Sequence, residues 1–132
     1  KILSVDIEKI RKINNVSFKQ CDFREDKAKE EIKSFFHEGL DVIISDMAAN
    51  TTGNKSLDCI RTNQLCSDVI EFSAKSLKPN GVLISKLFMG EDFNEVKNLA
   101  KLIFKKVHFF KPEASRNKSK ETYLHCATLK TL

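Results

Sequence analysis

The sequence predicts an open α/β fold with a mostly parallel sheet and an antiparallel hairpin at one edge. Apolar runs of strand length alternate with segments of helical periodicity, which is typical of strand–helix–strand units. The last two runs are separated only by a loop, which favours antiparallel pairing. The 132 residues suit a single domain, residues 1–132, and a composition with 41% hydrophobic residues excludes a disordered or fibrous chain.

Six short runs have the length and composition of strands. Residues 41–46 and 82–88 are almost continuously apolar, as expected of central strands that are buried on both faces. Residues 16–22 instead alternate between apolar and polar side chains. The expected strands are, in order, residues 2–6, 16–22, 41–46, 82–88, 106–110 and 122–129.

Three segments between these strands have apolar residues at helical spacing. The first is highly charged and ends before Gly39, a residue typical of helix ends. Residues 78–81, with the sequence KPNG, predict a turn after the second helix. The expected helices are residues 24–39, 57–77 and 91–105.

The first residue, Lys1, is followed directly by the apolar residues ILSV. Natural chains rarely begin in this way, so we expect that an N-terminal segment is missing and that the fold is N-terminally truncated.

The net positive charge is compatible with a polyanionic partner. The formal net charge is +5, which fits nucleic acid but also fits a surface that uses lysine as its common polar residue. There is no run of eighteen apolar residues and no recognisable signal peptide, so we expect a cytoplasmic protein without a membrane partner. The four cysteines show no CxxC spacing, and no metal site is expected.

Ionisable residues stand at the carboxyl ends of four predicted strands: Asp6, Asp22, Asp46 and Lys86. Open α/β sheets bind ligands at this edge, and a charge there is costly unless it is paired or faces a ligand. Asp6 and Asp22 have an alternative role as helix caps. Lys86 interrupts an otherwise apolar strand, and Asp46 is its expected partner, in an active site or in a purely structural ion pair.

Three segments together resemble the FtsJ/RrmJ-type RNA ribose 2′-O-methyltransferases, including the RlmE-like enzymes of large-subunit ribosomal RNA. They are SDMAANTTG, SLKPNGVLISKLFMGED and FKPEASRNKSKETYL, and the similarity covers nearly the whole chain. The resemblance implies a Rossmann-like fold and S-adenosyl-L-methionine as the methyl donor.

The family's Lys-Asp-Lys-Glu tetrad implies three catalytic residues in this chain, Asp46, Lys86 and Glu121. The first lysine of the tetrad and the glycine-rich cofactor loop belong upstream of Lys1. The resemblance also implies cofactor contacts at Asp46, at Asp6 with the ribose, at Asp22 with the adenine amino group, and at Phe23 along the adenine. The polar residues NTTG after Asp46 are expected to line the methionine end of the cofactor or the RNA entrance.

Methyl transfer to a ribose hydroxyl requires that the hydroxyl lose its proton. Lys86 could accept the proton as an amine, or stabilise the developing alkoxide as an ammonium. Asp46 would orient Lys86, Glu121 would complete the charge network, and no metal is needed.

The basic segment that precedes Glu121 is expected to contact RNA phosphates through Arg116, Lys118 and Lys120. The expected partner is ribosomal RNA or the large ribosomal subunit, with a uridine ribose as the acceptor and the protein acting as a monomer. The alternatives are a tRNA or mRNA-cap ribose methyltransferase, and a non-catalytic RNA-binding remnant. A base N-methyltransferase is disfavoured, because DMAAN does not match the N/D-P-P-aromatic motif of that class.

Overall fold

The computed structural model describes residues 1–113 and 120–131. The chain divides into two compact units, Lys1–His37 and Glu38–Leu132. Strands and helices follow one another in the predicted order, with bounds that differ from the predicted ones by a few residues. The predicted α/β alternation is therefore confirmed.

The first unit contains two parallel strands and one helix. Strand β1 (Leu3–Asp6) pairs with β2 (Ser17–Gln20), so their carboxyl ends lie at the same edge. Helix α1 (Asp26–Phe35) follows, and it buries Ala28 and Ile32, which are one turn apart.

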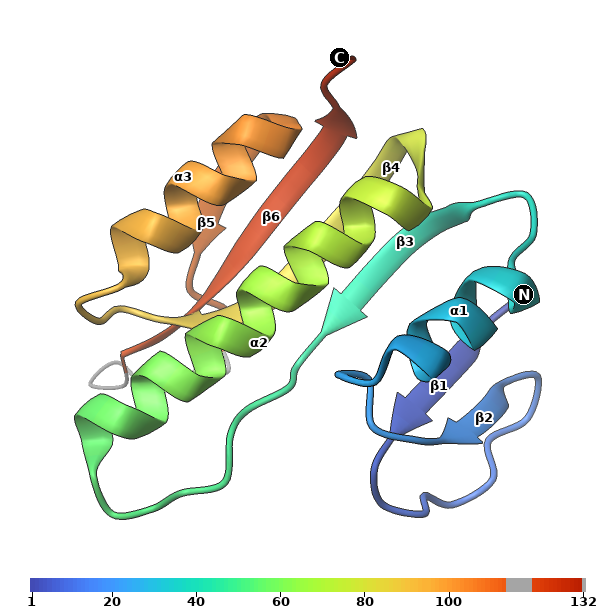
Figure 1. The fold of residues 1–132 in the computed structure, drawn as a ribbon, viewed down its shortest axis with the longest axis horizontal. Coiled ribbons are helices and arrows are strands. Elements are labelled where there is room, and N and C mark those ends of the chain that lie inside the picture. Colours follow the sequence, from blue (N-terminus) through green and yellow to red (C-terminus); the bar gives the residue numbers. More distant parts are fainter. Residues whose placement is uncertain (114–119, 132) are drawn as a thin grey trace. The chain divides into compact units, whose positions relative to one another are not determined.

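The second unit is built on a four-stranded sheet with the order β3-β4-β6-β5 (Figure 1). Strands β3 and β4 are parallel, whereas β6 is antiparallel to both β4 and β5. The predicted hairpin of the last two strands is present, with β5 at the edge. The four pairings in the two units are half parallel and half antiparallel, so the described strands form a mixed arrangement and do not establish a mostly parallel sheet. The strand bounds are β3 (Leu40–Ser45), β4 (Leu77–Phe88), β5 (Phe104–Phe110) and β6 (Glu121–Leu129).

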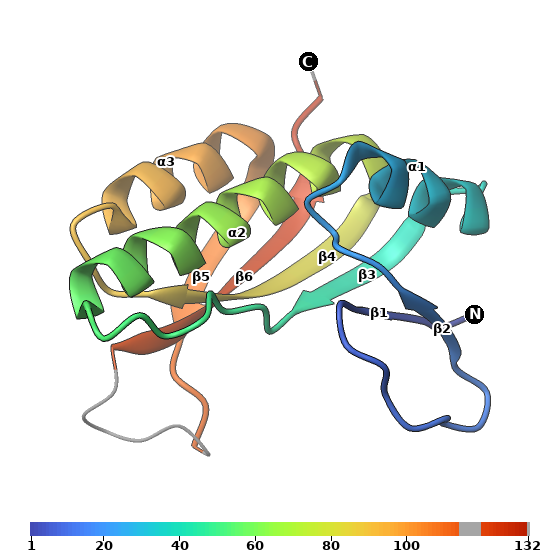
Figure 2. The same ribbon diagram turned by 60° about the horizontal axis from the view of Figure 1, so that its bottom comes forward.

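Helices α2 (Lys55–Ser76) and α3 (Phe93–Ile103) lie side by side over one face of this sheet (Figure 2). Alternate residues of β4 are buried, and Leu83 and Leu87 are completely inaccessible. Because side chains alternate across a strand, Lys86 projects from the opposite face. None of the helices in the described ranges is long and apolar enough to cross a membrane.

The predicted turn at residues 78–81 lies within the bounds of β4, so this strand begins at Leu77 rather than at residue 82. The pairing of β3 with β4 passes from Leu40–Leu77 to Val42–Val82. The four β4 residues between Leu77 and Val82 are left out of the pairing and form a bulge. A Cβ atom on Gly81 would lie 2.8 Å from the Leu77 side chain and 3.0 Å from the Lys78 carbonyl oxygen. A side chain at position 81 would therefore crowd the Lys78 carbonyl and force the Leu77 side chain to move.

We expect Gly81→Ala to lower the free energy of unfolding by about 1–3 kcal/mol, because the added methyl group overpacks the bulge. The measurement is urea denaturation monitored by circular dichroism. Gly90→Ala is the matched control, since its Cβ would meet Cys59 at an ordinary 3.5 Å. Equal stability of the two variants would contradict the role assigned to Gly81.

Candidate active site

One lysine and two carboxylates form a charged cluster at the carboxyl end of β4. The Lys86 ammonium lies 3.2 Å from Asp46 Oδ1 and 3.5 Å from Glu121 Oε2. The Lys86 side chain is only 14% exposed, whereas that of Asp46 is 68% exposed. The cluster thus presents a nearly buried cation beside a carboxylate that solvent or a ligand can reach.

The strand register explains why three distant residues meet. Asp46 directly follows β3, whose last residue, Ser45, is paired with Ser85 of β4. Glu121 begins β6 and is paired with Phe88, two residues beyond Lys86 on the same strand. The structure therefore brings together the three residues that were predicted to be catalytic.

Tyr123 also belongs to this cluster, although no role was predicted for it. It is the β6 residue paired with Lys86, and its hydroxyl donates to Asp46 Oδ1 at 2.5 Å and to Glu121 Oε1 at 3.4 Å. Its ring stacks on Phe110 at 5.9 Å between centroids. The hydrogen bond to the Asp46 carboxylate, with a further contribution from burial, raises the pKa of Tyr123 above its ordinary value of 10.

Tyr123 is the only tyrosine and the chain has no tryptophan, so its ionisation can be followed directly by ultraviolet absorbance. We expect its titration midpoint to lie above pH 10, and Asp46→Asn to bring it back toward pH 10. Because the folded pKa is the higher one, the interaction stabilises the fold below pH 10, and this contribution is lost as the pH rises through the folded pKa. A midpoint at pH 10 in the unmodified protein would contradict the short Tyr123–Asp46 hydrogen bond.

Asn63 of α2 fixes the backbone at the end of β4. It is completely buried, its amide donates to the Phe88 carbonyl at 2.9 Å, and its carbonyl accepts from the Phe88 N–H at 2.8 Å. The same amide donates to Asp92 at the start of α3, at 2.7 Å. One residue further on, the Met89 N–H donates to the carbonyl of Lys120, next to Glu121. Asn63 therefore fixes the backbone at the end of β4, the strand that carries Lys86.

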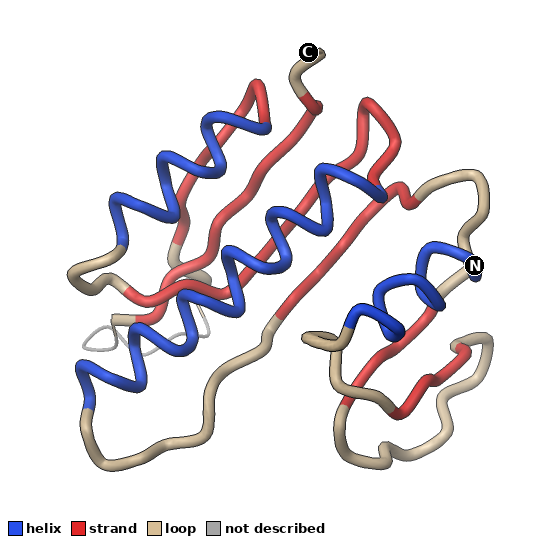
Figure 3. Tube along the Cα trace, in the orientation of Figure 1, coloured by secondary structure: helices blue, strands red, loops and turns tan. Residues whose placement is uncertain are grey.

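The polar loop between β3 and α2, visible in Figure 3, is held by the first turns of that helix. Thr52 donates to Asp58 through its N–H at 3.0 Å and its hydroxyl at 2.7 Å. Asn54 caps α2 by accepting from the Leu57 N–H. One residue of the NTTG segment, Thr52, thus stabilises this loop itself.

The predicted adenosine-binding residues lie in the first unit, at the shared carboxyl edge of β1 and β2. Asp6 is exposed, and its Oδ1 accepts from the Glu8 N–H at 3.0 Å. Both oxygens of Asp22 accept from the Arg24 guanidinium, which lowers the pKa of Asp22 to about 2. Phe23 is half-buried, and the Lys29 ammonium lies 5.2 Å from its ring centroid.

The alternative that Asp6 and Asp22 are helix caps is not supported. β1 leads into a loop and β2, not into a helix. The N-cap residue of α1 is Glu25, and Asp22 Oδ1 accepts instead from the Arg24 N–H at 3.0 Å. The Asp6 and Asp22 carboxylates therefore form local turns at the strand ends.

Of the three residues predicted to contact RNA, Arg116 and Lys118 lie outside the described residues. Lys120 is exposed and precedes Glu121. Over residues 1–113 and 120–131, no group of three or more His, Cys, Asp or Glu side chains is arranged to hold a metal ion.

The fold is that of the α/β methyltransferases. The structure resembles that of a Plasmodium falciparum protein assigned as a ribosomal RNA methyltransferase, with a TM-score of 0.84 and 29% identity over 98% of this chain and 72% of the other. It also resembles human methyltransferase-like protein 13 in complex with S-adenosylhomocysteine, with a TM-score of 0.64 over 96% and 60% of the two chains; at 18% identity this likeness concerns the fold alone.

Residues 1–129 match the family model of the FtsJ-like methyltransferases, and the chain belongs to that family. It is 39% identical to the ribosomal RNA large subunit methyltransferase E of Pelagibacter ubique, over 98% of this chain and 64% of the relative. It is 46% identical to the protein of the same name from Rickettsia akari, over 94% and 55% respectively. The chain thus spans between half and two thirds of the length of these curated relatives.

Proposed function

We propose that this protein transfers a methyl group from S-adenosyl-L-methionine to a ribose 2′-hydroxyl of large-subunit ribosomal RNA, at a uridine. The observation that carries the proposal is the cluster in which Lys86 is held between Asp46 and Glu121. These residues are at the positions where the family resemblance implies catalytic groups.

The relatives named above support ribosomal RNA over the tRNA and mRNA-cap alternatives, because both are named as large-subunit methyltransferases. The presence of Asp46, Lys86 and Glu121 together in one cluster supports an enzyme over a non-catalytic remnant. A buried lysine with two carboxylate partners is costly to maintain without a use.

The residues of the first unit fit the adenosine part of the cofactor. Asp6 is exposed, and its Oδ2 atom has no partner within residues 1–113 and 120–131, so it can accept from ribose hydroxyls. Arg24 contacts both oxygens of Asp22, and a carboxylate with four lone-pair sites can accept one further donor such as an adenine amino group. The backbone around Phe23 would lie along the adenine. When bound, S-adenosyl-L-methionine supplies an electrophilic methyl group on a sulfonium.

The charged cluster would act on the ribose hydroxyl. We assign Lys86 the ammonium role: it stabilises negative charge on the hydroxyl oxygen as the bond to the methyl group forms and the O–H proton passes to solvent, which reaches the cluster at the exposed Asp46. Asp46 and Glu121 fix the ammonium from two sides, and Tyr123 fixes Asp46 through its hydrogen bond. Asp46 is exposed enough to face the cofactor as well.

We further propose that residues 1–132 act as one methyltransferase domain, since the family match runs through both compact units. A ribosomal substrate implies a cytoplasmic protein, and no second copy is needed to complete the charged cluster. Lys120, together with Arg116 and Lys118, remains a proposed RNA contact.

The test is methyl transfer from tritiated S-adenosyl-L-methionine to purified large ribosomal subunits that lack the modification. We expect label in the ribosomal RNA, and no label when tRNA or capped mRNA is the acceptor. Cofactor binding without transfer to any RNA would contradict the proposal.

A further inference from the structure

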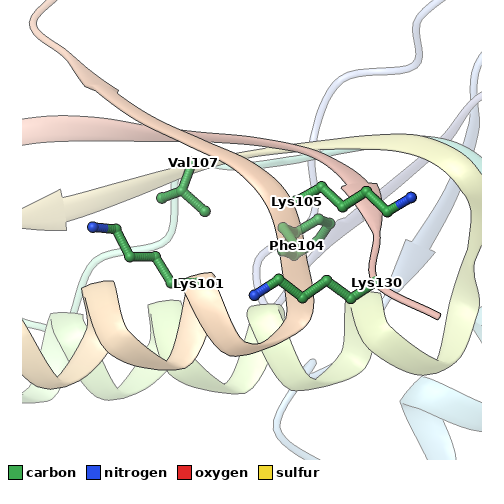
Figure 4. A pocket seen from close by; sticks show the side chains of 5 residues that line it. All are labelled: Lys101, Phe104, Lys105, Val107 and Lys130. Atoms are coloured by element: carbon green, nitrogen blue, oxygen red, sulfur yellow. The ribbon is translucent and has the colours of Figure 1, made fainter. Parts of the chain in front are cut away.

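Three lysines surround a shallow depression at the end of the sheet opposite to the charged cluster. Lys101 comes from α3, Lys105 from β5, and Lys130 follows β6 (Figure 4). The depression has a volume of about 280 Å³, and Phe104 and Val107 complete its lining. The Lys130 N–H donates to the Ile103 carbonyl at 2.8 Å, which ties the segment after β6 to the end of α3.

No acidic residue balances these lysines. All three are exposed, and none has a carboxylate within 4.0 Å in the described part of the chain. The sequence contains no Asp or Glu between Glu95 and Glu113, and none after Glu121. Three positive charges around one depression, none of them paired with a carboxylate of the described residues, favour an external anion.

An interaction with the end of a helix does not explain why all three lysines are at this depression. Lys101 lies in the last turn of α3, where a cation complements the helix dipole. Lys105 and Lys130 lie outside the helix, and that interaction accounts for neither of them.

We propose that Lys101, Lys105 and Lys130 bind the phosphate backbone of the RNA substrate at a second contact, remote from the charged cluster. The aromatic ring in the depression belongs to Phe104, which is 1% exposed and cannot stack on a base. Lysine ammonium groups around a shallow surface interact with phosphates and do not distinguish one base sequence from another.

The two contacts are far apart. Glu121 and Leu129 are the two ends of β6, and eight residue steps of a strand span roughly 26 Å. An RNA that touches both contacts must extend over at least this distance. This inference rests on the proposed function, because it names a second contact of the same substrate.

The experiment compares the protein with two triple variants in binding to a fluorescent, structured RNA derived from the large subunit. One variant is Lys101→Gln/Lys105→Gln/Lys130→Gln. The matched control removes three exposed lysines of the first unit, Lys9→Gln/Lys12→Gln/Lys27→Gln, and changes the net charge equally. Dissociation constants are measured from low to moderate salt, without cofactor.

We expect the first variant to bind at least tenfold more weakly at low salt, with the slope of log K against log salt concentration reduced by about 2–3. The control should keep the slope of the unmodified protein. All three proteins should have the same melting temperature, since the lysines are exposed. Equal slopes in the two variants would overturn the proposal.

A competition with polyglutamate separates RNA from an acidic protein partner. If the first variant lost affinity for polyglutamate but not for RNA, the RNA assignment would be overturned. Because binding is measured without methyl transfer, failure of the enzyme reaction in the unmodified protein would refute the proposed function and leave the binding result intact.

Discussion

Lys86→Ala is expected to lower kcat for methyl transfer between about a hundredfold and a thousandfold, which is the usual effect of removing a preorganised group that stabilises developing charge. The cause is the loss of the ammonium that Asp46 and Glu121 hold in place. Cofactor affinity should change little, because Lys86 is not among the residues assigned to the adenosine. The measurement is single-turnover transfer of tritiated methyl to ribosomal RNA.

Lys78→Ala is the matched control for this prediction. Lys78 is also a β4 residue, and its ammonium lies 3.0 Å from the carboxylate of a β3 residue, Asp41. It lies at the other end of the strand, so its loss should leave kcat unchanged. Lys86→Arg keeps the charge but cannot act as a base, and it should retain more activity than Lys86→Ala. Equal rates for Lys86→Ala and Lys78→Ala would refute the role of Lys86.

The second large effect is expected from Asn63→Leu, which should lower the free energy of unfolding by about 2–4 kcal/mol. Leucine has a similar volume but leaves the N–H and C=O of Phe88 and the Asp92 carboxylate without the Asn63 amide. The measurement is equilibrium unfolding in urea.

Gln64→Leu serves as the control, because Gln64 is the next residue of α2 and is exposed. Its effect should stay within about 0.5 kcal/mol, the usual range for surface substitutions. We also expect Asn63→Leu to slow methyl transfer under conditions in which it remains folded, since Asn63 fixes the end of the strand that carries Lys86. A fully stable and fully active Asn63→Leu protein would contradict this assignment.

The charged members of the cluster could be predicted from the sequence for a simple physical reason. A lysine in an apolar strand, and an aspartate at the end of the neighbouring strand, break the hydrophobic pattern at positions that a sheet brings together. The family resemblance added Glu121, which has no such signal of its own. The order of strands and helices followed from periodicity, because each element is long enough to show its pattern.

Tyr123 and Asn63 were missed because their roles depend on tertiary register. Tyr123 and Glu121 are two residues apart on β6, so their side chains lie on the same face. Only the antiparallel pairing of β6 with β4 sets Tyr123 opposite Lys86. Asn63 lies seven residues before Ile70, within the buried stripe of α2, and a polar residue in that stripe was the available signal. The mixture of parallel and antiparallel pairs depends on the strand order, in which β6 lies between β4 and β5, and periodicity along the sequence does not give that order.

The central claim, that the Lys86 cluster directs a methyl group to a ribose oxygen, is tested most directly by alkaline hydrolysis of the labelled RNA product. A 2′-O-methyl group blocks alkaline cleavage of the adjacent phosphodiester, because that cleavage requires a free 2′-hydroxyl. We predict that all the tritium appears in alkali-stable dinucleotides, and that Lys86→Ala removes this label. Tritium in mononucleotides would place the methyl group on a base and would contradict the account.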